Sequence, residues 1–140
     1  MVFFVGEYQV NFSGQGRIII PKKIREALGT GKTFTLTKGF TSCLSGFRND
    51  DWKKAANELI GQSTLDNRKE ETKRHLFSSS AIMEIDNQRR FVIPKPLLDY
   101  AELRNRATII GVGDHFEIWE PQKWQGYLQK IEKNESLKSL

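Results

Sequence analysis

The chain has 140 residues, of which 38% are hydrophobic and 28% are charged, with eleven glycines, four prolines and a formal net charge of +5. This composition is typical of a folded globular protein and excludes the collagen-like, proline-rich and coiled-coil classes. No apolar run approaches the ~20 residues of a membrane helix, and the first residues do not resemble a signal peptide, so we expect a cytoplasmic protein without a membrane partner.

The first part of the chain contains a turn followed by a short basic helix. Residues 13–17 join two alternating apolar runs, and Gly14 and Gly16 allow the backbone angles of a tight turn that presents Gln15 and Arg17 outward. Pro21 suits the first position of a helix over residues 21–28, and Gly29 suits its end. This helix carries Lys22, Lys23 and Arg25, so residues 13–25 hold four basic side chains and no acidic one.

A hairpin, a helix and a charged segment follow. Residues 35–47 are typical of two β runs around a glycine turn. Trp52, Ala55, Ala56 and Leu59 have the spacing of a helix with one apolar face. Residues 65–80 are rich in charged residues and helix formers and end in a serine run, which indicates a solvated helix or linker.

The pattern of the first part then recurs. The segment RRFVIP at residues 89–94 matches GRIIIP at residues 16–21, with Arg90 aligned to Arg17 and Pro94 to Pro21 at the same offset of 73 residues. The turn at residues 86–90 begins with an Asp-Asn pair that favours a turn. A second hairpin over residues 108–119 precedes another helix with one apolar face. That face consists of Trp124, Tyr127, Leu128 and Ile131.

These repeats define the predicted organisation. We expect a first module at residues 1–62, a helical connector at 63–79, a second module at 80–133 and a flexible tail at 134–140. The fold class is mixed β+α, mainly β, with an intramolecular pseudo-two-fold repeat. The apolar helix faces should pack on the core, although part of them could contact a neighbouring subunit.

The basic turns are the candidate binding residues. Arginine can pair bidentately with guanine and glutamine with adenine, while lysines and backbone N–H groups hold phosphates. The alternative is that such turns only keep the protein soluble, but solubility does not require charge at equivalent positions of both copies. The predicted DNA-binding residues are Gln15, Arg17, Lys22, Lys23, Arg25, Gln88, Arg89, Arg90 and Lys95.

No constellation of residues indicates catalysis or a metal. Cys43 is the only cysteine, and His75 and His115 cannot complete a zinc site with it. The acids Glu58, Asp66, Glu70 and Glu71 are more typical of a solvated helix face than of metal ligands. We therefore expect no enzyme activity, no catalytic residue, no metal, no cofactor and no small-molecule substrate.

The two turn motifs, GQGRIIIPKKIR and DNQRRFVIPKPLL, together with a final FEIW hairpin, resemble the MraZ family of transcriptional regulators. The resemblance extends to the AbrB/MazE-like superfamily and implies two tandem SpoVT-AbrB type modules. It implies an AbrB-like double-split, swapped-hairpin β-barrel capped by short helices and formed within one chain. It also implies a ring-shaped homo-oligomer, nucleoid-associated, that binds double-stranded DNA at short direct repeats in the promoter of the division and cell-wall gene cluster, as a repressor.

The chain departs from the family pattern at four positions. Ser13 stands where the family usually has Asp, Gln15 where Lys is common, Arg89 where Gly is usual and Leu98 where Arg often follows the proline. Losing the acid at Ser13 removes a negative charge and Arg89 adds a positive one, so our hypothesis is that attraction to phosphate is retained.

Three alternatives remain at this point. An antitoxin-like regulator of the same superfamily would also mask a toxin with a carboxy-terminal tail, but here a second module occupies that place. An oligomeric scaffold could bind protein or RNA through non-specific polyanion contacts. An enzyme would need a pocket with perturbed acids. Selective binding to duplex repeats would separate the regulator from the scaffold.

Overall fold

The two copies of the repeat fold into the same series of elements in the computed structural model, which describes residues 2–62 and 64–134. Each copy runs strand, strand, short helix, two-stranded hairpin and long helix. The first copy comprises β1 (Glu7–Asn11), β2 (Arg17–Ile19), α1 (Lys22–Leu28), β3 (Thr33–Lys38), β4 (Leu44–Phe47) and α2 (Asn49–Ile60). After α3 (Asn67–Ser79), the second copy comprises β5 (Ala81–Glu84), β6 (Arg90–Val92), α4 (Lys95–Ala101), β7 (Arg106–Gly111), β8 (Phe116–Trp119) and α5 (Pro121–Glu132).

The strands of the two copies are interleaved. Six strands form one antiparallel sheet in the order β1-β7-β8-β4-β3-β5, so β1 of the first copy pairs with β7 of the second, and β5 pairs with β3. The remaining two strands, β2 and β6, form a separate antiparallel ribbon. The mixed α and β class is confirmed. A closed barrel is not found among the described residues, because the strands divide into two sheets, and the swapped-hairpin barrel stays a prediction.

One apolar core lies between the six-stranded sheet and the ribbon. Ile18 of β2 and Phe91 of β6 point into it, and Phe91 meets Phe34 of β3 edge to face with ring centroids 5.0 Å apart. Phe116 of β8 packs on the other side of Phe34 at 5.5 Å. Since each copy contributes to this core, burial of apolar surface holds the two copies together as one unit.

The short helices agree with the sequence prediction apart from their first residue. Pro21 and Pro94 lie just before α1 and α4 at the cap position, one residue earlier than the expected first helical position. A proline is tolerated there because its missing N–H would have no partner inside the helix. Gly29 ends α1 with a φ of 86°, as predicted, and Glu102 takes the same place after α4 with a φ of 55°.

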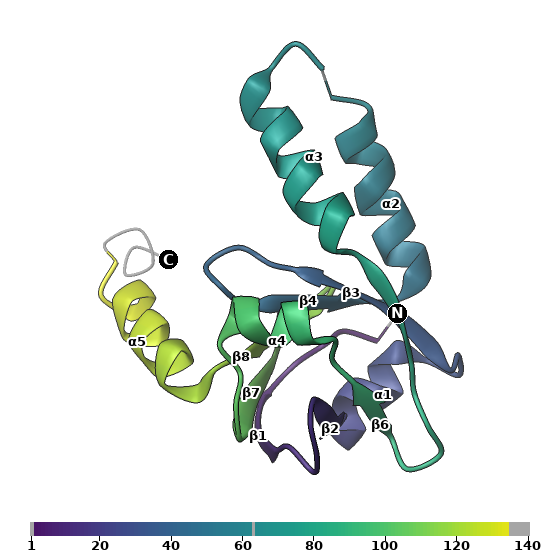
Figure 1. Ribbon diagram of the computed structural model, residues 1–140, viewed down its shortest axis with the longest axis vertical. Coiled ribbons are helices and arrows are strands. Elements are labelled where there is room, and N and C mark those ends of the chain that lie inside the picture. The colour runs from purple at the N-terminus through teal and green to yellow at the C-terminus, as the bar shows by residue number, and fades with distance from the viewer. Residues whose placement is uncertain (1, 63, 135–140) are drawn as a thin grey trace.

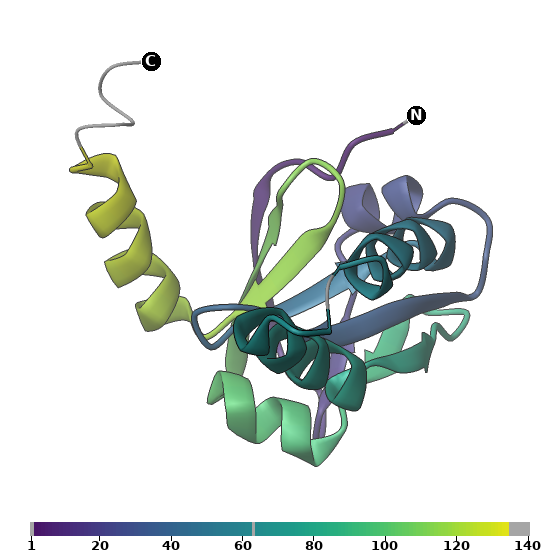
Figure 2. The same ribbon diagram turned by 90° about the horizontal axis from the view of Figure 1, so that it is seen from above.

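The longer helices stand away from the core. Helices α2 and α3 rise together from the end of the molecule opposite the β2–β6 ribbon, and α5 projects to one side (Figures 1 and 2). None of the described residues of α3 is buried, although its end is fastened to β3 by Thr37 and Ser79, whose hydroxyls lie 2.9 Å apart. The module boundaries remain predictions, and residues 135–140 of the predicted tail lie outside the described residues.

Candidate nucleic-acid interface

The two basic turns share one backbone design. The N–H of Ser13 donates to the carbonyl of Arg17 at 3.0 Å, and the N–H of Asp86 donates to that of Arg90 at 2.9 Å. The residue before each arginine has a positive φ, 75° at Gly16 and 62° at Arg89. The pseudo-two-fold repeat predicted from the sequence is therefore present in the detailed geometry of the turns.

Each turn is also bonded to the strand that follows the other turn. Ile93 donates its N–H to the carbonyl of Gly16 at 2.8 Å, and Ile20 donates to that of Arg89 at 2.7 Å. These reciprocal bonds extend the ribbon beyond the paired residues of β2 and β6. Both turns are consequently held on one two-stranded element rather than on two independent loops.

The solvent-facing side of this ribbon presents two arginines on a diagonal. Ile18 and Phe91 face the core, so the residues on either side of them alternate outward. Arg17 pairs across the ribbon with Val92, and Ile19 pairs with Arg90. The outer face thus combines two guanidinium groups with two aliphatic side chains that are 37% (Ile19) and 54% (Val92) exposed.

The two arginines differ in their surroundings. The guanidinium of Arg90 forms an ion pair with Asp86, its Nε lying 3.0 Å from Oδ2. The N–H of Arg90 donates to the Asp86 carboxylate, as does that of Gln88, and these bonds lower the pKa of Asp86 below its ordinary value. Arg17 has Ser13 in the place of this acid, and among the described residues its guanidinium has neither a hydrogen bond nor an ion pair.

The other predicted residues divide into free and engaged groups. Lys22 and Lys23 are exposed at the start of α1, close along the chain to β2. Lys95, at the equivalent position of α4, pairs with Asp99 at 2.8 Å on the surface.

Arg25 is turned to the far end of α1, where it donates to the carbonyls of Gly29 and Gly31. The structure therefore gives Arg25 a local role at the helix end and does not bring it to the turns. Gln15 and Gln88 are both exposed within the turns.

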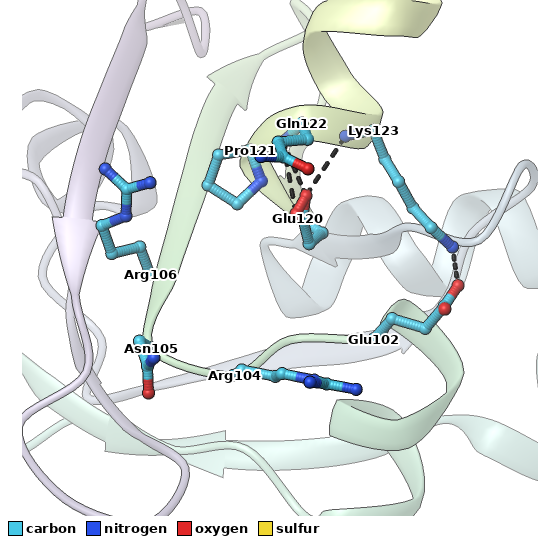
Figure 3. A pocket seen from close by; sticks show the side chains of 8 residues that line it. All are labelled: Glu102, Arg104, Asn105, Arg106, Glu120, Pro121, Gln122 and Lys123. Carbon is cyan, nitrogen blue, oxygen red and sulfur yellow. Dashed lines mark hydrogen bonds and ion pairs between the residues drawn. The ribbon is translucent and has the colours of Figure 1, made fainter.

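The interleaved strands bring further basic residues beside the turns. The N–H of Phe12 donates to the carbonyl of Asn105 at 2.9 Å, which places Arg104 and Arg106 next to the first turn. Both arginines are exposed and line a hollow in front of α5 (Figure 3). On the opposite side, Ile85 donates to the carbonyl of Lys32, which puts this exposed lysine beside the second turn. Sequence reasoning missed these residues because they belong to the other copy of the repeat.

The acidic groups of this hollow already have partners. Glu120 caps α5 by accepting the N–H groups of Gln122 and Lys123, and the side chain of Lys123 forms an ion pair with Glu102 (Figure 3). Among the described residues, Arg104 and Arg106 have no carboxylate partner. The hollow is thus a basic surface beside the first turn, and its lining residues include no pair of free acids suited to proton transfer.

His115 and Cys43 lie away from the ribbon. His115 bonds to Asp114 and Glu117 at 2.8 and 3.2 Å, and Cys43 is buried beneath α5. Within residues 2–62 and 64–134, no three His, Cys, Asp or Glu side chains come together as a group that could hold a metal ion. No helix in that part of the chain is both long and apolar enough to span a bilayer.

Comparison with known families settles the relationship suggested by the motifs. A family model described as MraZ protein matches the chain twice, at residues 3–75 and again at residues 76–139. The chain belongs to the MraZ family. The two successive matches also confirm the tandem repeat deduced from the turn motifs.

Several members of the MraZ family are similar to this chain over most of their length. A protein of Roseiflexus castenholzii is 41% identical over 137 residues, covering 96% of this chain and 92% of the relative. A second Roseiflexus protein has the same identity and coverage. A protein of Dictyoglomus thermophilum is 40% identical over 124 residues, covering 89% and 84% of the two chains. All three relatives are named Transcriptional regulator MraZ.

Proposed function

We propose that this protein is a non-enzymatic transcriptional regulator that binds double-stranded DNA through the outer face of the β2–β6 ribbon. The observation that carries the proposal is the pair of diagonal arginines, Arg17 and Arg90, on a rigidly bonded two-stranded element. The major groove of B-DNA admits a two-stranded β-ribbon, and arginine donors there can pair with guanine while aliphatic side chains contact thymine methyl groups. Ile19 and Val92 supply the aliphatic contacts.

Phosphate contacts would flank this reading face. Lys22 and Lys23 lie on one side of it, and Arg104 and Arg106 extend the positive surface beyond the first turn. Neutralising phosphates releases counterions, so binding should weaken as salt rises. This arrangement needs no cofactor and no small-molecule substrate.

The target and the outcome of binding follow the family expectation. We propose that the protein acts in the cytoplasm, associated with the nucleoid, and represses the division and cell-wall gene cluster by binding short direct repeats in its promoter. A reporter gene placed behind that promoter should be less active when the protein is supplied. Unchanged or increased reporter activity would contradict the repressor role.

Self-association into a ring-shaped homo-oligomer is part of the proposal. Val2, Phe3 and Val5 are exposed apolar side chains on a segment that runs along residues 111–113, where Val112 is exposed too. Apolar side chains next to an edge strand are typical of surfaces covered by association. Sedimentation of the full chain should give one closed species several times heavier than the 16.2 kDa monomer. A monomer at micromolar concentration would contradict ring formation.

The direct test compares a promoter duplex carrying the direct repeats with a scrambled duplex of the same composition, over a series of salt concentrations. We expect the promoter duplex to bind more tightly and Arg17→Ala to weaken binding and reduce the logarithmic salt slope by about 0.9, the value for one phosphate contact. Lys54→Ala removes the same charge from α2, at the other end of the molecule, and should change neither. Equal binding to both duplexes would instead favour an oligomeric scaffold that binds protein or RNA through non-specific polyanion contacts.

A further inference from the structure

The two turns hold their arginines in different ways. In the second turn, Oδ1 of Asp86 accepts the N–H groups of Gln88 and Arg90, both at 2.8 Å, while Oδ2 accepts the Nε–H of the Arg90 side chain at 3.0 Å. The carboxylate is therefore fixed to the turn backbone, and the guanidinium is fixed to the carboxylate. In the first turn, Ser13 is too short and uncharged to do this for Arg17.

Because the Nε–H of Arg90 is bonded to Asp86, the two Nη groups at the end of the side chain remain available as donors. A guanidinium is planar and carries five N–H donors in a fixed fork. When Nε is occupied, the two terminal Nη groups remain as a paired donor edge, which is the edge that can meet O6 and N7 of one guanine together. A side chain that is already ordered also loses less rotamer freedom on binding.

Arg17 has the opposite properties. Glu84 and Asp86 line the same hollow as Arg17, but among the described residues neither forms an ion pair with its guanidinium, so the side chain keeps its rotamer freedom. Such a group can follow a phosphate wherever the duplex backbone places it, but it does not favour one base by geometry. The same position in the repeat thus offers an ordered donor pair in one copy and an adaptable cation in the other.

We infer that Asp86 is a positioning residue that makes Arg90 the base-reading arginine of the ribbon, while Arg17 serves mainly as an electrostatic contact to the DNA backbone. This inference rests on the proposed DNA-binding function and goes beyond it by dividing the roles of the two turns. The specificity of the protein is accordingly expected to come from its second copy.

The first variant removes the charge of the positioning residue without removing the turn. In Asp86→Asn, the remaining side-chain oxygen can still accept the two backbone N–H groups, but the amide no longer attracts the Nε–H of Arg90. We expect binding to the scrambled duplex to be unchanged or tighter, because a negative charge is lost. Binding to the promoter duplex should weaken roughly two- to tenfold, the range expected for ordering one long side chain.

The matched variant transfers the acid to the first turn. Ser13→Asp should give Arg17 the same support, weaken binding to the scrambled duplex and increase the ratio of promoter to scrambled affinity. Introducing Asp86→Asn into an Arg90→Lys background should leave that ratio unchanged, since lysine cannot present the paired donor edge. If Asp86 acted only by shaping the turn, Asp86→Asn would lower the ratio of promoter to scrambled affinity both in the wild-type protein and in Arg90→Lys, which would contradict the inference.

The outcomes separate the inference from the proposed function. If the wild-type protein does not prefer the promoter duplex, the proposed function itself fails. If the wild-type protein does prefer the promoter duplex, two results would overturn the inference. One is that Asp86→Asn binds both duplexes more tightly by the same factor, and the other is that Ser13→Asp binds both duplexes more weakly by the same factor. Either result would mean that the carboxylate acts only as a negative charge that repels phosphate. Thermal unfolding of each variant confirms that the folded proteins are being compared.

Discussion

At the scale of single residues, the left-handed position of the two turns is occupied by different residues. Gly16 has a φ of 75°, and a Cβ added there would lie 2.6 Å from the carbonyl oxygen of Ile93. Arg89 has a φ of 62° at the equivalent position and accommodates its side chain. The first turn therefore requires glycine for two reasons, whereas the second turn tolerates a side chain at the cost of backbone strain.

Substitutions at this position should have unequal effects on stability. Gly16→Ala is expected to lower the free energy of unfolding by about 1–3 kcal/mol, because strain and a close contact coincide. Arg89→Gly relieves the strain but gives the unfolded chain more freedom, so it should change stability by less than about 1 kcal/mol. Urea unfolding of both variants measures the difference. Equal destabilisation by the two variants would contradict the inequivalence of the turns.

His115 gives stability a pH dependence. Burial disfavours the charged imidazole, but the hydrogen bonds that the ring donates to the carboxylates of Glu117 and Asp114 outweigh that effect and raise the pKa of His115 above its ordinary value. A raised pKa in the folded state stabilises the protein fully below the unfolded pKa, and this contribution is lost as the pH rises through the folded pKa. The melting temperature of the wild-type protein should therefore fall, relative to that of His115→Gln, as the pH rises from about 6.5 into the mildly alkaline range. Parallel melting curves for the two proteins across that range would show that the ion pairs do not form.

At the scale of elements, α5 is fastened to the sheet by one buried side chain. Trp124 packs against Cys43, Ile110 and Trp119, and its Nε1–H donates to Glu7 of β1 at 2.8 Å. Cys43 is 1% exposed beneath the helix, and burial raises the pKa of its thiol to about 12. The thiol should therefore be almost inert toward alkylating reagents in the folded protein, because the thiolate is the nucleophile.

Loosening α5 should expose this thiol. Trp124→Ala removes most of the helix contact and is expected to raise the rate of Cys43 alkylation at pH 8 by about tenfold or more through local opening. Gln125→Ala, on the exposed side of the same helix, serves as the control and should leave the rate unchanged. Equal rates in wild type and Trp124→Ala would mean that α5 does not protect this part of the sheet.

Much of the secondary structure can be predicted from local sequence patterns. Glycine and proline positions predict the turn and helix ends, and the spacing around Trp52 and Trp124 predicts α2 and α5. The pairing of strands between the two copies could not be predicted, because alternation within a strand indicates which residues are buried but not which strand lies beside it. For the same reason Arg104, Arg106 and Lys32 were missed, while Ile19 and Val92 could have been found from the alternation around Ile18 and Phe91.

At the scale of the whole molecule, the interleaved strands make the two copies interdependent. Strand β1 pairs with β7 and β5 pairs with β3, so a single copy would leave edge strands and core residues such as Phe34 and Phe91 without their partners. Expressed alone, residues 1–75 and residues 76–140 should each lack the cooperative unfolding transition of the full chain. Mixing the two fragments should restore it, as monitored by circular dichroism. A cooperative fold in either fragment alone would show that the copies are independent.

The central claim is that the β2–β6 ribbon is the DNA-binding face, and amide hydrogen exchange of the full protein with and without the promoter duplex tests it most directly. We expect the duplex to slow exchange in the turns and ribbon, at residues 13–19 and 86–92, and to leave the α2 and α3 helices at the opposite end unaffected. Protection confined to α2, α3 or α5, with exchange in both turns unchanged, would contradict the account and place the DNA-binding surface elsewhere on the molecule.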